Sequence, residues 1–300
     1  MVYYKVAEGL KECSGLADYD GETILLITGE EMKKRTDIDK LVIPNYKNAH
    51  CCKITVFKNC ASGDISIISK DKKMLRTNFG FIIEKNRVIF IDDGKAVQSI
   101  IRKIAKNKMH DKLTLERFLY EFFETIIEKD LRYIEEMSDR LVKIETAVIR
   151  GILSDFNSMM FNFKREILLF YRYYNQLMDI GYELEENENG FFSEEAVRRF
   201  EKFTRRAEQL REEIQFLRET SNQLRDVYNS QLDAKTNKIM KLLTIITMFF
   251  MPTSTIAAWY GMNFTTMPEL TSPFGYIGCI IFNILAILWC WWYMKKKKIM

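Results

Sequence analysis

The residues best suited to chemistry form a short uncharged stretch near the C-terminus, Tyr260-Gly261-Met262-Asn263-Phe264. Asn263 offers a carboxamide oxygen, and Gly261 exposes its backbone carbonyl because it has no side chain. Both oxygens are neutral hydrogen-bond acceptors. Asparagine is also well suited to end a helix. A helix C-cap therefore explains Asn263 as simply as a ligand-binding role does, and the two roles can hold together.

Two apolar segments flank this stretch and would have to position it. Leu242–Pro268 and Leu270–Met294 contain no charged residue, and Glu269 alone separates them. A bilayer core requires about 20 apolar residues in helical form. Leu242–Tyr260 supplies 19 residues and Phe274–Met294 supplies 21. Because backbone groups in lipid must be satisfied internally, both segments are predicted to be transmembrane helices.

Lysines on both sides of this pair of spans predict its orientation. Lys235, Lys238 and Lys241 precede the first span, Lys295–Lys298 follow the second, and the connection Gly261–Pro273 has neither Lys nor Arg. Basic flanks stay on the cytoplasmic side. We therefore expect a multi-pass protein of the plasma (inner) membrane with both termini cytoplasmic. Its outer loop is too short to suggest an enzyme.

Composition excludes several other classes of function. The net charge is +4, and four of the positive charges are the terminal lysines beside a span, so no nucleic-acid partner is expected. The six cysteines include no C-x-x-C pair and are predicted to be reduced. His50-Cys51-Cys52 could suggest zinc, but a zinc site needs about four ligands and the chain has two histidines. Strand core is the favoured interpretation.

Residues 1–93 are predicted to form a cytosolic α/β domain with a mixed sheet. Short β-rich runs alternate there with turn-like clusters. The predicted strands are Thr23–Thr28, Cys52–Phe57, Asp64–Ile68, Phe79–Glu84 and Val88–Asp92, with a turn at Asn59–Gly63 and a hairpin at Lys85–Arg87.

Residues 94–240 are predicted to form a cytosolic domain of long helices. Apolar residues recur at helical spacing over Leu113–Gly151, and Phe156–Tyr182 is predicted to be another helix. Glu183–Gly190 is predicted to be a break. Ser193 then has the properties of a helix N-cap.

The helix that begins after Ser193 meets no Gly or Pro before Pro252. It is predicted to run unbroken from Glu194 to Tyr260, about 100 Å at 1.5 Å per residue. A polar helix that continues into a membrane span can couple the two regions mechanically. The alternative is a coiled-coil stalk without a signalling role. The remaining residues, 241–300, would form the two-helix membrane hairpin with its basic tail.

A series of motifs follows the polar end of this helix: Asp226-Val-Tyr228, Lys235-Thr-Asn237, Asn237–Thr247, Met251-Pro252, Tyr260–Phe264, Met267–Leu270 and the four terminal lysines. With this series the chain resembles the CorA family of magnesium channels, strongly from about Leu224 to the C-terminus. The Gly-Met-Asn triplet alone would be a weak signal. Its place at the outer end of the first of two C-terminal spans makes it specific.

The resemblance implies a funnel-shaped homopentamer embedded in the lipid membrane. Five first spans would line one pore, and the second spans would form an outer ring. The family transports Mg²⁺ and often accepts Co²⁺ and Ni²⁺. The resemblance implies no cofactor, with Mg²⁺ as the transported ion and as a candidate regulatory ion.

The resemblance also assigns roles to residues. Gly261, Met262 and Asn263 would form the selectivity filter, with Asn263 and Gly261 binding the metal through its coordinated waters. Asp226 would add a carboxylate at the cytosolic end of the pore and Glu269 a carboxylate in the outer loop. The predicted pore-lining residues are Asn237, Met240, Leu243, Thr247, Met251 and Ser254. The simpler alternative for the pore-lining residues is packing between spans. For Asp226 it is a charge on a solvated helix face.

The sequence departs from the family pattern in two places, and two alternative functions stay open. The His-Pro-Leu segment that many members carry is absent, and an acidic position of the family's Mg²⁺ sensor falls on Lys202, with Glu201 and Glu208 close by. Transport of zinc or another divalent cation is one alternative function. A non-conducting, membrane-anchored helical scaffold is the other. No G-x-x-x-x-G-K-[ST] nucleotide motif is present, so passive transport is expected.

Overall fold

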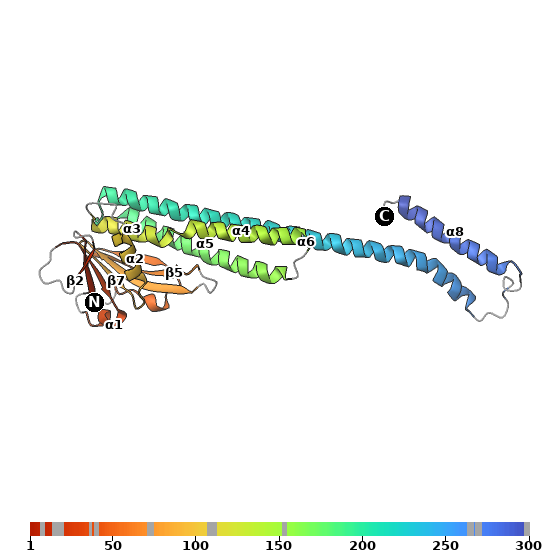
Figure 1. Ribbon diagram of the computed structural model, residues 1–300, viewed down its shortest axis with the longest axis horizontal. Helices are drawn as coiled ribbons and strands as arrows, with labels where there is room; N and C mark the ends of the chain where they lie inside the picture. The colour runs from red at the N-terminus through yellow and green to blue at the C-terminus, as the bar shows by residue number, and fades with distance from the viewer. Residues whose placement is uncertain are drawn as a thin grey trace. The chain divides into compact units, whose positions relative to one another are not determined.

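The computed structural model describes residues 1–6, 10–13, 21–35, 38, 42–70, 75–106, 113–151, 155–262, 267 and 272–296. The chain divides into two compact units, Met1–Gln223 and Leu224–Met300. The first unit contains the sheet and most of the helices, and the second contains the C-terminal half of one long helix and a further apolar helix (Figure 1). The predicted boundaries at residues 93 and 240 stay predictions.

A mixed seven-stranded sheet dominates the N-terminal part of the first unit, in the order β2-β1-β3-β7-β6-β5-β4. Strands β3 and β7 pair in parallel, and the other described neighbours pair antiparallel. The prediction of a mixed sheet is therefore confirmed. The strands are β1 (Val2–Lys5), β2 (Lys11–Cys13), β3 (Thr23–Ile27), β4 (Lys53–Phe57), β5 (Cys60–Ile68), β6 (Arg76–Glu84) and β7 (Arg87–Ile91).

Two of the connections between consecutive strands were predicted, with different outcomes. The β6–β7 hairpin forms as expected, with Glu84 opposite Arg87. The turn predicted at Asn59–Gly63 is right only at Asn59, because the β4–β5 turn is Lys58-Asn59 and β5 already begins at Cys60. Gly63 lies within β5, where an added Cβ would come within 2.2 Å of the Lys53 carbonyl oxygen. A glycine inside a strand often marks such a close approach of another backbone.

Helices cover both faces of the sheet. Side chains alternate between the two faces along each strand, so each face has apolar side chains that a helix buries. On one face, Phe79 and Phe90 meet Phe122 with ring centroids 5.8 and 4.6 Å apart. Burying each such ring stabilises the fold by about 1.5–3 kcal/mol. On the other face, Ile82 and Ile89 pack against the short helix α1 (Gly29–Lys33) and the 3₁₀ helix η1 (Tyr46–Asn48).

The remaining helices of the first unit are α2 (Ala96–Lys106), α3 (Leu115–Ile127), α4 (Asp130–Ile149) and α5 (Phe156–Glu186). The apolar repeat over Leu113–Gly151 therefore belongs to two helices, which separate at Glu128-Lys129. Asp130 is buried at this junction, pairs with Lys70 and accepts a 3.0 Å hydrogen bond from the Tyr174 hydroxyl. Burial raises the pKa of the Asp130 carboxyl, against the influence of Lys70.

Helix α5 is longer than predicted and includes Glu183–Glu186. It ends at Asn187, which adopts a left-handed conformation with φ of 47°. Asparagine tolerates this conformation better than most residues. The predicted break therefore begins at Asn187 rather than at Glu183.

Helix α6 runs unbroken over Glu194–Tyr260, 67 residues, as predicted. The Ser193 hydroxyl accepts a hydrogen bond from the Ala196 amide at 3.3 Å and donates one to Glu116 at 2.7 Å. Ser193 is therefore the expected N-cap. Within the first unit the buried apolar residues of α6 follow alternating steps of three and four, the spacing of one packed helix face: Ala196, Phe200, Phe203, Ala207, Leu210, Ile214 and Leu217.

Candidate functional site

Among the described residues, two helices are long and apolar enough to cross a membrane: α6, through its C-terminal part, and α8 (Gly275–Lys296). Their most apolar 18-residue windows are 0% and 6% buried in the single chain. Contiguous exposed apolar surface of this size needs lipid or another protein surface to cover it. By length and composition, both predicted spans are therefore supported.

One polar contact fixes which side of α6 faces α8. The Thr253 hydroxyl donates a 3.2 Å hydrogen bond to the Asn283 carboxamide oxygen. Polar side chains of apolar helices often join neighbouring helices in this way. Further toward the end of α6, a cavity of about 480 Å³ lies between the two helices. It is lined by Thr255, Ile256, Trp259 and Tyr260 of α6 and by Gly275, Gly278, Cys279 and Phe282 of α8.

The predicted pore residues lie on a different side of α6. At 100° per residue, Met251 is about 160° around the helix from Thr253. Met240, Thr247 and Met251 follow one another at steps of seven and four and form one stripe, which we call the open stripe. Met240 and Met251 are 55% and 65% exposed. Helix α8 therefore leaves this stripe uncovered.

The other predicted residues continue or border the open stripe. Asn237 and Asp226 extend it toward the polar part of α6, and both are exposed. Leu243 and Ser254 lie on its edge, about 80° and 60° around the helix from Met251. The structure thus brings the predicted pore residues to one side of one helix. Their role in conduction stays a prediction.

Hydroxyl groups within the span are satisfied by the helix itself. Thr244 and Thr247 donate to the carbonyls of Met240 and Leu243 at 2.8 and 2.9 Å. Such bonds to the preceding turn remove an unpaired donor from an apolar setting. The Thr247 oxygen keeps lone pairs that can accept a hydrogen bond from water. Pro252 leaves the Met248 carbonyl without its usual helical donor.

Helix α6 ends where the predicted filter begins. The Gly261 amide donates to the Ala257 carbonyl at 2.9 Å, and the Met262 amide donates to the Trp259 carbonyl at 3.3 Å. Gly261 and Met262 are both exposed. Asn263 and Glu269 lie outside the described residues, so the geometry of the filter itself stays a prediction.

Comparison with known proteins identifies the family. The family described as CorA-like Mg²⁺ transporter protein matches residues 30–296. The chain belongs to this family. Its members are transporters, so the chain is not an enzyme.

Individual CorA proteins match to different extents. The cobalt/magnesium transport protein CorA of Thermotoga maritima is 25% identical over 268 residues, which cover 87% of this chain and 76% of that protein. The magnesium transport protein CorA of Escherichia coli strain K12 is 43% identical over 67 residues, 22% of this chain and 21% of that protein.

Solved structures share the fold of this CorA-family chain. The CorA magnesium transporter of Methanocaldococcus jannaschii superimposes with a TM-score of 0.79 at 17% identity, covering 98% of this chain and 96% of that chain. The ZntB cytoplasmic domain of Vibrio parahaemolyticus gives a TM-score of 0.63 at 10% identity over 78% of this chain and 98% of that domain.

The structure also bears on metal sites away from the spans. Among the described residues, no group of three or more His, Cys, Asp or Glu side chains could hold a metal ion. Glu201 and Glu208, beside Lys202, pair with arginines of their own helix at 2.5 and 3.8 Å. A regulatory Mg²⁺ site in this CorA protein stays a prediction.

The strand-core prediction for His50-Cys51-Cys52 holds only for the burial of Cys52, because all three residues precede β4, His50 is exposed and Cys51 is half-buried. Burial raises the pKa of the Cys52 thiol to about 12. Metals bind the thiolate, so this cysteine does not favour the zinc interpretation of His50-Cys51-Cys52.

Sequence reasoning missed the contact that orients the CorA spans. Asn283 is a lone carboxamide inside an apolar helix. Polar residues within membrane helices usually face a neighbouring helix, so Asn283 could have been singled out. Its partner could not, because several hydroxyls of α6 are within the same length of span.

Proposed function

We propose that this chain forms a homopentameric channel through which the membrane potential drives Mg²⁺ into the cytoplasm, with Co²⁺ and Ni²⁺ also carried. The observation that carries the proposal is the open stripe of α6, which α8 leaves uncovered. Five copies of α6 that turn this stripe toward a common axis would enclose a path, with α8 outside. Membership in the CorA family and the names of its relatives support Mg²⁺ and Co²⁺ as cargo.

The filter suits an ion that keeps its water. Mg²⁺ is small and gives up coordinated waters reluctantly. Five Asn263 carboxamides and five Gly261 carbonyls would accept hydrogen bonds from those waters. Neutral acceptors bind a dication weakly enough to release it, and conduction requires such weak, multi-site binding. Glu269 at the outer loop and Asp226 at the cytosolic end would raise the local cation concentration.

The membrane potential supplies the driving force. An inside-negative potential favours entry by about 2.3 kcal/mol per charge per 100 mV, so roughly 4.6 kcal/mol for Mg²⁺. The proposed orientation places both termini in the cytoplasm at the plasma membrane. Lysines at the end of α8 support it, since Lys295 and Lys296 lie 5.4 and 5.1 Å from the rings of Trp291 and Trp292. Aromatic and basic residues concentrate at membrane interfaces.

Flux measurements with the purified protein in liposomes test this function. Mg²⁺, Co²⁺, Ni²⁺ and Zn²⁺ are supplied outside, and an inside-negative potential is set with K⁺ and valinomycin. We expect uptake of Mg²⁺, Co²⁺ and Ni²⁺ that grows with the potential. Uptake confined to Zn²⁺ would instead favour the zinc-transporting branch. Absence of uptake for all four ions would favour the scaffold.

Polar substitution of the open stripe should open the path further. Met240, Leu243 and Met251 would form an apolar constriction that excludes water in the closed state. Met251→Ser adds five hydroxyls to it, so we expect Mg²⁺ flux about three- to tenfold above the wild type, where tenfold corresponds to about 1.4 kcal/mol. Stopped-flow fluorescence of an entrapped Mg²⁺ dye measures the rate.

Ile246→Ser is the matched control for this substitution. Ile246 is 45% exposed and lies about 140° around α6 from Met251. The same change in polarity there should leave the flux within about twofold. An equal rise for both variants would mean that serine loosens the spans generally, and it would remove Met251 from the constriction.

A further inference from the structure

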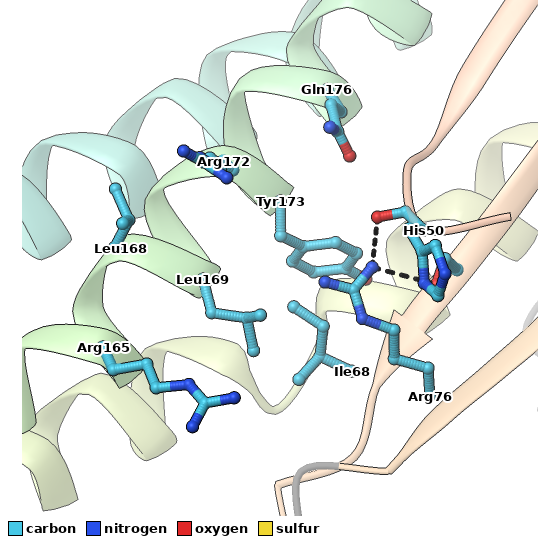
Figure 2. Close-up of a pocket in the computed structure, with 10 residues that line it drawn as sticks. His50, Ile68, Arg76, Arg165, Leu168, Leu169, Arg172, Tyr173 and Gln176 are labelled. Atoms are coloured by element: carbon cyan, nitrogen blue, oxygen red, sulfur yellow. Dashed lines mark hydrogen bonds between the residues drawn. The ribbon is translucent and has the colours of Figure 1, made fainter. Parts of the chain in front are cut away.

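A cavity of about 360 Å³ lies within the first unit, between α5 and the adjoining ends of β5 and β6 at Ile68 and Arg76 (Figure 2). Ligand sites in proteins usually span about 300–1,000 Å³, so a small molecule could enter it. The cavity is lined by His50, Ser66, Ile68, Arg76, Arg165, Leu168, Leu169, Arg172, Tyr173 and Gln176. This lining has no part in the channel proposed above.

The lining is positively charged without compensation. It includes Arg76, Arg165 and Arg172 and, within the described part of the chain, no carboxylate. Arg165 and Arg172 lie seven residues apart on α5 and therefore share one face of it. Neither makes an ion pair among the described residues, whereas Arg199, Arg205 and others on α6 each pair with a glutamate four residues earlier.

The third arginine is held in place. The Arg76 guanidinium donates from one nitrogen, Nη1, to the His50 carbonyl and, at 3.5 Å, to the Ser66 hydroxyl (Figure 2). Ser66 in turn donates to Asn78 at 2.8 Å. A guanidinium has five N–H donors, and the described bonds start from one of its three nitrogens. Arg76 is therefore oriented toward the cavity with donors to spare.

A buried hydroxyl in the same lining, that of Tyr173, has no hydrogen-bond partner among the residues that the structure describes. Tyr173 is 4% exposed. Its ring extends from α5 toward Arg76 (Figure 2). Burial raises the pKa of Tyr173 well above its usual value, so the group is a neutral donor. An unsatisfied buried donor is costly, and a ligand that accepts from it would remove that cost.

From these groups we infer that the cavity binds a small phosphate monoester, with the phosphate on Arg76, Arg165 and Arg172 and the Tyr173 hydroxyl donating to it. Arginine forks match phosphate oxygens in geometry as well as in charge. Three guanidinium groups suit a ligand with two negative charges, such as a phosphate monoester, better than a ligand with one carboxylate. Ile68, Leu168 and Leu169 provide an apolar wall for the organic part of the ligand. A nucleoside monophosphate combines both features.

Calorimetric titration of the full-length protein in detergent, without Mg²⁺, tests the inference. The probes are AMP, inorganic phosphate and adenosine. We expect AMP to bind, inorganic phosphate to bind more weakly because it lacks the organic part, and adenosine not to bind. Binding of inorganic phosphate as tight as that of AMP would identify a free-phosphate site with the same chemistry. No binding of either anion at millimolar concentration, or adenosine binding as tightly as AMP, would overturn the inference.

Variants locate the site. Arg165→Gln and Arg172→Gln should each weaken AMP binding tenfold or more, and neither side chain is buried, so the fold should tolerate the changes. Arg198→Gln is the matched control, because Arg198 is an exposed arginine of α6. An equal loss of affinity in Arg198→Gln would mean a general effect of net charge and would overturn the assignment.

Tyr173→Phe separates binding from folding. The variant keeps the ring and removes the unpartnered hydroxyl. We expect affinity for AMP to fall about threefold or more, while the melting temperature without ligand is unchanged or higher. A lower melting temperature with unchanged affinity would show that the hydroxyl has a structural partner and does not reach the ligand.

Discussion

Replacing Asn263 with alanine is expected to reduce Mg²⁺ flux in liposomes at least about 100-fold, to the level of protein-free vesicles. In a pentamer the substitution removes five carboxamides at once. Each hydrogen bond contributes about 0.5–1.5 kcal/mol net, so losing five acceptors removes roughly 2.5–7.5 kcal/mol of stabilisation of the hydrated ion. Since 1.4 kcal/mol is a factor of ten, the lower end of this range already accounts for most of the expected effect.

Asn283→Ala is the matched control, because it removes a carboxamide of the same kind from α8, away from the predicted filter. This substitution breaks the Thr253–Asn283 hydrogen bond, and such bonds between membrane helices contribute about 0.6 kcal/mol on average. We expect flux within about threefold of the wild type. Size-exclusion chromatography with light scattering checks that both variants keep the oligomeric state of the wild type.

Two results would contradict the filter assignment. Normal flux by Asn263→Ala would mean that the hydrated ion does not depend on this carboxamide. Equal reductions in Asn263→Ala and Asn283→Ala would mean that flux reports the integrity of the hairpin and not a filter. Asn263→Asp adds a further measurement: a carboxylate ring should bind Mg²⁺ more tightly and release it more slowly, which lowers the maximal flux.

Much of the fold follows from local pattern. Short β-rich runs between turn-like clusters predicted the strands from β3 onward, and the absence of Gly and Pro between Ser193 and Pro252 predicted one continuous α6. The predictions of secondary structure that were wrong lie where tertiary contacts determine the local structure. Gly63 was predicted to lie in a turn, yet it pairs with Ile54 and Phe81 within β5, and it is a glycine there because the Lys53 carbonyl leaves no room for a Cβ. No breaker separates α3 from α4, where Asp130 is buried against Lys70 and Tyr174.

The candidate site was likewise predicted in part from local pattern, and the rest depends on tertiary contacts. Helical spacing alone placed Met240, Thr247 and Met251 on one stripe. Which side of α6 would meet α8 could not be predicted, since it depends on the pairing of Thr253 with Asn283. The arginine cavity was missed entirely. Arg76 and Arg172 are far apart in the sequence and come together only because α5 packs against the sheet edge.

The largest expected effect on stability concerns a buried carboxylate between α4 and α5. Glu166, 5% exposed, accepts hydrogen bonds from the Tyr133 hydroxyl at 2.6 Å and from Arg140 at 3.1 Å. Arg140→Met keeps the aliphatic stem and removes the cation. The Glu166 charge then lies buried with one donor. Breaking a fully buried pair costs about 3–5 kcal/mol, and because the Arg140 side chain is 46% exposed, we expect about 3 kcal/mol, the lower end of this range.

We expect the melting temperature of Arg140→Met to fall by roughly 6–12 °C, since 1 kcal/mol shifts it by about 2–4 °C in a chain of this size. Fluorescence-detected thermal unfolding of the full-length protein in detergent measures the shift. Arg132→Met is the matched control on the same helix. Arg132 and Glu136 are 83% and 61% exposed and 3.5 Å apart, and exposed pairs contribute about 0–1 kcal/mol.

A double substitution distinguishes the buried charge from weakened packing. Adding Glu166→Leu to Arg140→Met removes the uncompensated carboxylate, and apolar replacement of a buried pair is often neutral. The Tyr133 hydroxyl then has no acceptor on Glu166, so recovery should be partial, at least half of the decrease. A double variant as unstable as Arg140→Met would mean that packing of the guanidinium on Tyr133 and Phe163, whose ring centres lie 6.0 and 5.7 Å away, matters more than neutralisation of Glu166.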